Sequence, residues 1–111
     1  MSGKQLQLPS IDDLIAEIKT YNPSTDETLI RRAYVLAESM HGDQRRDSGE
    51  PYITHPLSVA MILASLSLDD TTIIAGLLHD VVEDTSVTLE DIKKDFSEDL
   101  ATIIDGVTKL N

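Results

Sequence analysis

A long apolar run in the second half of the chain constrains the fold more than any other feature. Residues 73–82 read IIAGLLHDVV, and their only ionisable members are His79 and Asp80. A helix that is apolar on nearly every side has to be surrounded by other elements. We therefore expect a helix over about residues 71–82, capped by the aspartates at 69–70, to be the central helix of a bundle.

The rest of the chain favours an all-α fold, because apolar positions recur at helical spacing between caps and helix breakers. Asn22-Pro23 separates the first two expected helices, and Gly42 ends the second. Residues 1–9 are expected to be a disordered tail, and residues 10–111 to form one helical bundle of about six helices. The expected helix starts are Ser10 with Asp13, Ser24 with Glu27, Pro56, Asp69, Thr88 with Asp91, and Ser97.

Composition agrees with this fold and excludes several functions. Aromatic residues make up 4% of the chain and Trp is absent, so the core has to consist of Leu, Ile, Val, Ala and Met. The formal net charge of −11 repels phosphate groups and anionic lipids, so neither nucleic acid nor a membrane is expected as a partner. The chain has no cysteine, no apolar stretch of about 18 residues and no secretory signal, and we expect a cytoplasmic protein.

His55, His79 and Asp80 are the candidate metal ligands. A carboxylate inside an apolar segment costs free energy unless it is paired or neutralised. A divalent cation accepts imidazole and carboxylate ligands together and offsets their desolvation. His55, at an expected helix start, completes a set of nitrogen and oxygen ligands. Such a set can make a bound water acidic enough to attack near neutral pH, which indicates a metal-dependent hydrolase site.

Glu83 and Asp84 are the candidate catalytic acids. Glu83 follows His79 by four residues and Asp84 follows Asp80 by four, so each pair shares a helix face if the helix continues. Either carboxylate is able to accept a proton from an attacking water or to orient it. Because they directly follow the apolar run, we expect both carboxylates to be partly buried and to lose hydration, as Asp80 does.

A polar segment, residues 42–54, holds the candidate substrate-binding residues. Arg binds phosphate through two parallel hydrogen bonds, and the chain is otherwise short of cations. Arg45 and Arg46 are therefore the expected phosphate clamp. Ser48 adds a hydroxyl group, and Tyr52 either stacks on a base or packs within the protein.

Each of these features also has an ordinary structural explanation. A His-Asp pair by itself is most often a core histidine with its hydrogen bonds satisfied, next to a solvated helix end. His55 by itself reads as a surface residue at a helix start, and loop arginines read as surface charge. His41 is expected simply to complement the carboxyl end of a helix. The combination of residues, not any one of them, favours a site.

Three motifs taken together resemble a known family. They are QxRxSGEPYxxHP over residues 44–56, LLHDVVEDT over residues 77–85 and DGVTKL over residues 105–110. Over roughly residues 25–111 the chain is similar to the N-terminal hydrolase domain of the RelA/SpoT-homologue family. Members of this family are the long (p)ppGpp synthetase/hydrolases of the bacterial stringent response.

The resemblance implies an all-helical HD-domain fold that binds Mn²⁺ and a guanine nucleotide. The implied activity removes the 3′-pyrophosphate of (p)ppGpp and gives GDP or GTP and pyrophosphate. The intact acidic residues favour hydrolysis over the synthetase-only relatives. By position, the resemblance implies metal ligands at His55, His79 and Asp80, an acidic pair that handles the attacking water at Glu83 and Asp84, and a nucleotide loop at Arg46 and Ser48.

The family pattern also differs from this chain in two places. A further metal-ligating Asp and an Asn near the nucleotide come from a helix beyond the position of Asn111. We therefore expect the chain to lack the C-terminal helices of its domain, to bind Mn²⁺ more weakly and to be inactive or nearly so by itself. Asp47 stands where members often carry a basic or small residue, which lowers the expected substrate affinity. Ile103, Ile104 and Val107 are expected to be partly uncovered and to promote self-association.

Two other functions compete with this interpretation. One is a small HD phosphohydrolase for another nucleotide, against which the segment 48–55 argues. The other is a non-catalytic module, a truncated paralogue that serves regulation or interaction. Under the leading interpretation, the parent protein either only hydrolyses (p)ppGpp or also makes it as a GTP pyrophosphokinase.

Overall fold

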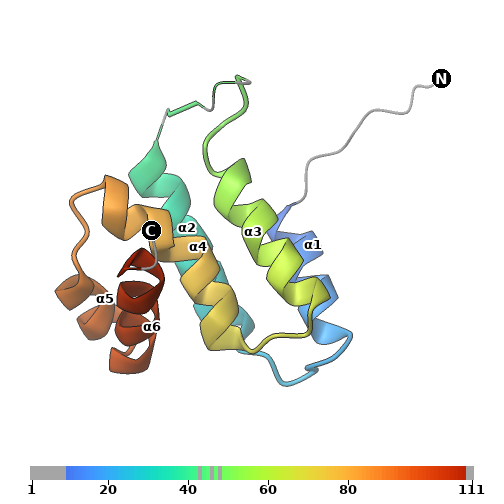
Figure 1. Ribbon diagram of the computed structural model, residues 1–111. Coiled ribbons are helices and arrows are strands. Elements are labelled where there is room, and N and C mark those ends of the chain that lie inside the picture. Colours follow the sequence, from blue (N-terminus) through green and yellow to red (C-terminus); the bar gives the residue numbers. More distant parts are fainter. Residues whose placement is uncertain (1–9, 43, 46, 48, 110–111) are drawn as a thin grey trace.

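The computed structural model describes residues 10–42, 44–45, 47 and 49–109. These residues form six helices and no strand, which confirms the expected all-α bundle (Figure 1). The helices are α1 (Ile11–Lys19), α2 (Glu27–His41), α3 (Thr54–Ser65), α4 (Asp70–Asp84), α5 (Leu89–Asp95) and α6 (Glu98–Lys109).

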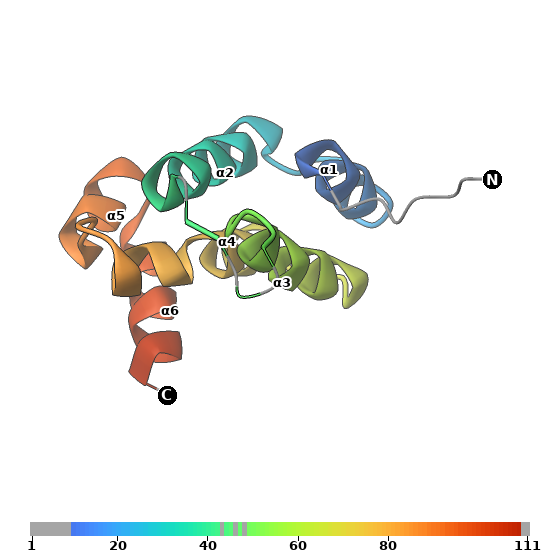
Figure 2. The same cartoon turned by 90° about the horizontal axis from the view of Figure 1, so that it is seen from above.

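The helices form two layers with a pair of helices at one end. α1 and α2 make one layer and α3 and α4 the other, with α1 against α3 and α2 against α4 (Figures 1 and 2). α5 and α6 pack on each other, and α6 also packs on α4. α4 therefore touches α2, α3 and α6, which confirms its expected central place.

The interior consists almost entirely of Leu, Ile and Ala side chains, as the composition requires. α4 contributes six of the fully or nearly buried apolar residues of this core, from Ile73 to Val81. At Gly76 an added Cβ atom would lie 2.7 Å from Cδ1 of Leu63. The missing side chain at Gly76 therefore lets α3 approach α4 closely.

The caps explain most helix starts. Ser10 with Asp13 and Thr88 with Asp91 form reciprocal capping boxes, and the carboxylate of Asp69 accepts a hydrogen bond from the Thr72 N–H. All three caps confirm the expectation from the sequence. Two expected starts lie elsewhere along the chain, at α2 and α3.

The expected start of α2 at Ser24 is wrong. Asp26 is the N-cap, and its carboxylate accepts from the backbone N–H of Leu29. Asp26 is held in place because its own N–H donates to the carboxylate of Asp70 at 2.9 Å, and the Thr25 hydroxyl donates to the same carboxylate. A contact with α4 thus decides between two local caps.

The expected start of α3 at Pro56 is also displaced. α3 begins at Thr54, so Pro56 is its third residue. Proline is tolerated there because the first N–H groups of a helix have no partner within the helix. The earlier start places His55 inside the first turn of α3.

The expected exposure on α6 is right for two residues and wrong for one. Ile104 is fully buried against the core, whereas Ile103 is half-buried and Val107 is 38% exposed. Ile104 is covered because the α5–α6 pair folds back on α4. Within the described residues, no helix is both long and apolar enough to cross a membrane.

Candidate metal centre

The packing of α3 on α4 brings His55, His79 and Asp80 together. His55 lies in the first turn of α3, and the other two lie near the carboxyl end of α4. One ligand atom from each residue lies within 4.8 Å of the others, and among the described residues this is the group able to hold a metal ion. The structure thus places His55 beside His79 and Asp80, which are adjacent to each other but more than 20 residues from His55 in the sequence.

Asp80 lies between the two imidazoles. Its Oδ1 is 3.1 Å from Nε2 of His79, and its Oδ2 is 3.6 Å from Nε2 of His55. The Asp80 side chain is 12% exposed, that of His79 is 18% exposed and that of His55 is 35% exposed. The group is therefore sheltered on the α4 side and open to solvent on the His55 side.

Both ring nitrogens of His79 face groups that only accept hydrogen bonds. Nδ1 lies 3.1 Å from the backbone carbonyl oxygen of Gly76, and Nε2 lies 3.1 Å from Oδ1 of Asp80. A neutral ring carries one proton, so it donates to one of these oxygens and directs a lone pair at the other. Two acceptors this close repel each other unless a second proton or a cation relieves them. The set of two imidazoles and one carboxylate therefore fits a divalent cation.

Tyr52 contributes a direct contact to the same group. Its hydroxyl donates to Oδ2 of Asp80 at 3.1 Å, and its ring lies 6.0 Å from the His55 ring. Tyr52 thus packs within the protein, which is one of its two expected roles, and its hydroxyl points at the candidate ligand Asp80. Sequence reasoning missed this contact, since no local pattern links positions 52 and 80.

Glu83 and Asp84 form the last turn of α4. The helix continues through Asp84, so Glu83 lies one turn beyond His79, and Asp84 one turn beyond Asp80. Both side chains are exposed. The expectation that they share the desolvation of the apolar run is wrong, because both side chains face solvent at the end of α4. Exposed carboxylates beside the group remain accessible to water and to a bound molecule.

The segment between α2 and α3 carries the expected phosphate clamp. Arg45 is exposed and forms an isolated antiparallel bridge with Pro51. Arg46 and Ser48 lie outside the described residues. The segment leads directly into α3, so Arg45 and His55 belong to one continuous stretch of chain.

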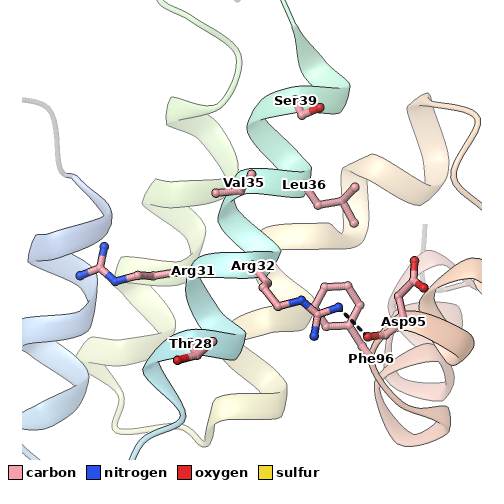
Figure 3. Close-up of a pocket in the computed structure, with 8 residues that line it drawn as sticks. All are labelled: Thr28, Arg31, Arg32, Val35, Leu36, Ser39, Asp95 and Phe96. Carbon is pink, nitrogen blue, oxygen red and sulfur yellow. Dashed lines mark hydrogen bonds between the residues drawn. The ribbon is translucent and has the colours of Figure 1, made fainter.

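A cavity away from this group lies between α2 and α5 (Figure 3). It measures about 580 Å³, and none of the described residues that line it was expected to be functional. Arg32, which lines this cavity, already has partners within the protein. Its guanidinium group lies 4.9 Å from the centre of the Phe96 ring and donates a hydrogen bond to the Asp95 carbonyl (Figure 3). A smaller cavity of about 270 Å³ adjoins His79 and is lined mainly by apolar side chains.

Comparison with known families decides the class of the protein. A family described as HD domain matches residues 33–111, which include the whole candidate metal centre. The chain belongs to the HD-domain family. The matched stretch contains the adjacent pair His79 and Asp80.

Relatives of this HD domain are RelA/SpoT-type proteins, as the motifs indicated. It is 47% identical over 103 residues to a probable GTP pyrophosphokinase of Mycobacterium leprae and 46% identical over 106 residues to a GTP pyrophosphokinase of Streptomyces coelicolor. It is 48% identical over 101 residues to a guanosine-3′,5′-bis(diphosphate) 3′-pyrophosphohydrolase of Aquifex aeolicus. These matches cover 91–93% of the chain but only 12–14% of each relative.

Proposed function

We propose that this HD domain is a metal-dependent hydrolase domain that removes the 3′-pyrophosphate from (p)ppGpp. The observation that carries the proposal is the convergence of His55, His79 and Asp80, with Nε2 of His79 3.1 Å from Oδ1 of Asp80. The name of the Aquifex aeolicus relative describes this reaction. The proposed products are GDP or GTP and pyrophosphate.

The three side chains are proposed to hold Mn²⁺. The carboxylate oxygen is a ligand that suits Mn²⁺, and the two imidazole nitrogens complete a nitrogen and oxygen set of the kind that divalent first-row metals accept. When bound, the cation supplies Lewis acidity toward a water and toward phosphate oxygens, and it offsets negative charge. His79 is oriented for this task by its bond to the Gly76 carbonyl, and Asp80 by the Tyr52 hydroxyl.

Glu83 and Asp84 are proposed to handle the proton of the attacking water. Their exposure at the end of α4 lets water reach them, and their helix register keeps them on the side of His79 and Asp80. A carboxylate within hydrogen-bond reach of the water would accept its proton as the bond to phosphorus forms. The bond between that phosphorus and the ribose 3′ oxygen breaks as the new bond forms. The 3′ oxygen leaves with a proton taken from the protonated carboxyl group or from solvent, and pyrophosphate is released.

The segment before α3 is proposed to bind the nucleotide. A substrate with several phosphate groups is repelled by a chain of net charge −11, so it needs local cations. Arg45 is exposed on this segment, and Arg46 and Ser48 follow it in the sequence. Guanidinium groups bind phosphate through paired hydrogen bonds, so these residues would orient the substrate beside His55.

A turnover experiment tests the proposed reaction. The chain is placed in excess over labelled ppGpp with Mn²⁺, because three protein ligands are expected to hold the cation weakly and turnover to be slow. Equal amounts of GDP and pyrophosphate are expected, with loss of both on addition of EDTA or in Asp80→Asn. A matched control is Asp105→Asn, which removes only an exposed carboxylate paired with Lys109. Release of orthophosphate, or unchanged turnover in Asp80→Asn, would contradict the proposal.

A further inference from the structure

We propose that His41 is a positioning residue that acts on Asp80 through Tyr52. The inference rests on the proposed function, because Asp80 is a metal ligand only under that proposal. His41 has no role in the proposed reaction, and from the sequence it was expected only to complement the carboxyl end of a helix. The argument follows the contacts outward from Asp80.

Tyr52 fixes one half of the Asp80 carboxylate. Its hydroxyl donates to Oδ2 at 3.1 Å, while Oδ1 faces Nε2 of His79 at 3.1 Å. The rotation of a carboxylate about its Cβ–Cγ bond is set by the partners of its two oxygens. The Tyr52 hydroxyl therefore determines which way the remaining lone pairs of Asp80 point.

His41 holds the Tyr52 ring from behind. It is the last residue of α2 and is 2% exposed, and its ring centre lies 4.6 Å from that of Tyr52. Nδ1 of His41 lies 3.2 Å from the side-chain oxygen of Gln44, so Nδ1 donates. The backbone oxygen of Gln44 in turn accepts from the Tyr52 N–H at 2.9 Å. His41 thus holds Tyr52 twice, by ring contact and through Gln44.

Packing alone does not explain an imidazole at position 41. Its Nε2 is buried without a hydrogen-bond partner in the described structure, which is unfavourable for a polar atom. A somewhat larger phenyl ring would also pack against Tyr52, without burying an unpaired nitrogen. The feature that a phenyl ring cannot supply is the Nδ1 donor to Gln44. We infer that this donor is the reason for histidine.

The same contacts join the nucleotide segment to the metal ligand. The Tyr52–Gln44 hydrogen bond and the Arg45–Pro51 bridge close the segment into a loop between α2 and α3. Tyr52 leaves this loop toward Asp80 on α4. Any rearrangement of the loop that moves Tyr52 therefore moves a hydrogen bond of Asp80.

Metal titrations of single and double variants test the inference. Tyr52→Phe removes only the hydroxyl, and His41→Phe keeps a ring but removes the donor. Loss of such an outer partner typically weakens metal binding by about 10–100-fold, so we expect a loss in this range for Tyr52→Phe and about tenfold for His41→Phe, measured from free Mn²⁺ by electron paramagnetic resonance. The double variant should bind no more weakly than Tyr52→Phe. Unchanged affinity in His41→Phe, or losses that multiply in the double variant, would overturn the inference.

Tyr21→Phe is the matched control. It also removes a partly buried tyrosine hydroxyl, which donates to the Leu68 carbonyl at 2.6 Å. Leu68 lies just before the start of α4, whereas Asp80 lies near the other end of this helix. It should lower stability and leave Mn²⁺ affinity at the wild-type value. A loss of affinity in Tyr21→Phe equal to that in Tyr52→Phe would show a general effect of stability and overturn the inference.

A metal-free measurement separates this inference from the proposed function. In the apo protein, hydrogen exchange of the Tyr52 amide reports its bond to Gln44, and His41→Phe should accelerate it more than Tyr21→Phe does. His41→Asn, which keeps a donor near the place of Nδ1, should restore protection and also serves if a phenyl ring is not accommodated. Equal exchange in wild type and both His41 variants overturns the inference. Absence of Mn²⁺ binding in the wild type overturns the proposed function, and amide exchange then decides the role of His41.

Discussion

Nδ1 of His79 lies 3.1 Å from the backbone carbonyl oxygen of Gly76, one helical turn earlier on α4. The same glycine is where α3 approaches α4, with Leu63 in the space that a side chain would fill. Gly76 therefore has two roles. Its carbonyl is an acceptor for Nδ1 of His79, and its missing side chain lets the helix that carries His55 come close.

Alanine substitution at the two glycines of α4 and α6 tests the close approach. Gly106→Ala should stabilise the protein by about 0.5–1 kcal/mol, because alanine is the better helix former and nothing lies within 4 Å of the added atom. Gly76→Ala should give none of this gain, because Leu63 has to move away from a contact of 2.7 Å. Urea unfolding measures both. Equal stabilisation at the two sites would show that α3 is not held at Gly76.

The N-cap of α4 should make stability depend on acid. Hydrogen bonds donated by Thr72 hold the pKa of Asp69 below its ordinary value of 3.8. A carboxylate whose pKa is lower in the folded state than in the unfolded state stabilises the folded state at any pH above its unfolded-state pKa. This contribution is lost as the pH falls from 3.8 through the lower pKa of the folded state. Asp69→Ala should cost about 0.5–2 kcal/mol near neutral pH.

Asp69→Asn is the control for this titration. Asparagine also caps helices but does not ionise, so the variant should fold near neutral pH with a small loss and should lose less stability than the wild type on acidification. Chemical unfolding near neutral pH and in acid gives the comparison. An identical acid dependence in wild type and Asp69→Asn would contradict the assigned role of Asp69.

Removal of the acids at the end of α4 should separate chemistry from metal binding. Glu83→Gln and Asp84→Asn keep the size of each side chain and remove its basicity. The variant that lacks the proton acceptor should lose about 10²–10⁴-fold in the rate of ppGpp hydrolysis while binding Mn²⁺ nearly as well as the wild type. Single-turnover rates and metal titrations of both variants provide the test. Wild-type rates in both would remove these residues from the mechanism.

The fold was predictable because its signals are local. The capping boxes at Ser10 and Thr88 lie within single turns, and the apolar run around Leu77 permits few places other than the centre of a bundle. The start of α2 was not predictable, since Asp26 competes with Ser24 and only the contact with Asp70 on α4 favours it. A tertiary contact of this kind leaves no trace in local sequence.

The candidate site was predictable to a similar degree. The residue types at positions 55, 79 and 80 indicate a metal site because of their chemistry, and the structure places them together. The burial of Glu83 was wrongly expected, because sequence does not show where α4 emerges from its neighbours. The contacts of Tyr52 with Asp80 and His41 depend on how a loop returns to two helices, which spacing alone does not specify.

Mn²⁺ binding to the wild type and to Asp80→Asn tests the central claim most directly. Free Mn²⁺ is followed by electron paramagnetic resonance in a titration of each protein, with Asp105→Asn as the control for the loss of one exposed carboxylate. Under the present account, wild type and Asp105→Asn bind a single Mn²⁺ per chain, and Asp80→Asn loses at least about tenfold in affinity. Equal Mn²⁺ binding by Asp80→Asn and the wild type would show that His55, His79 and Asp80 do not hold the ion.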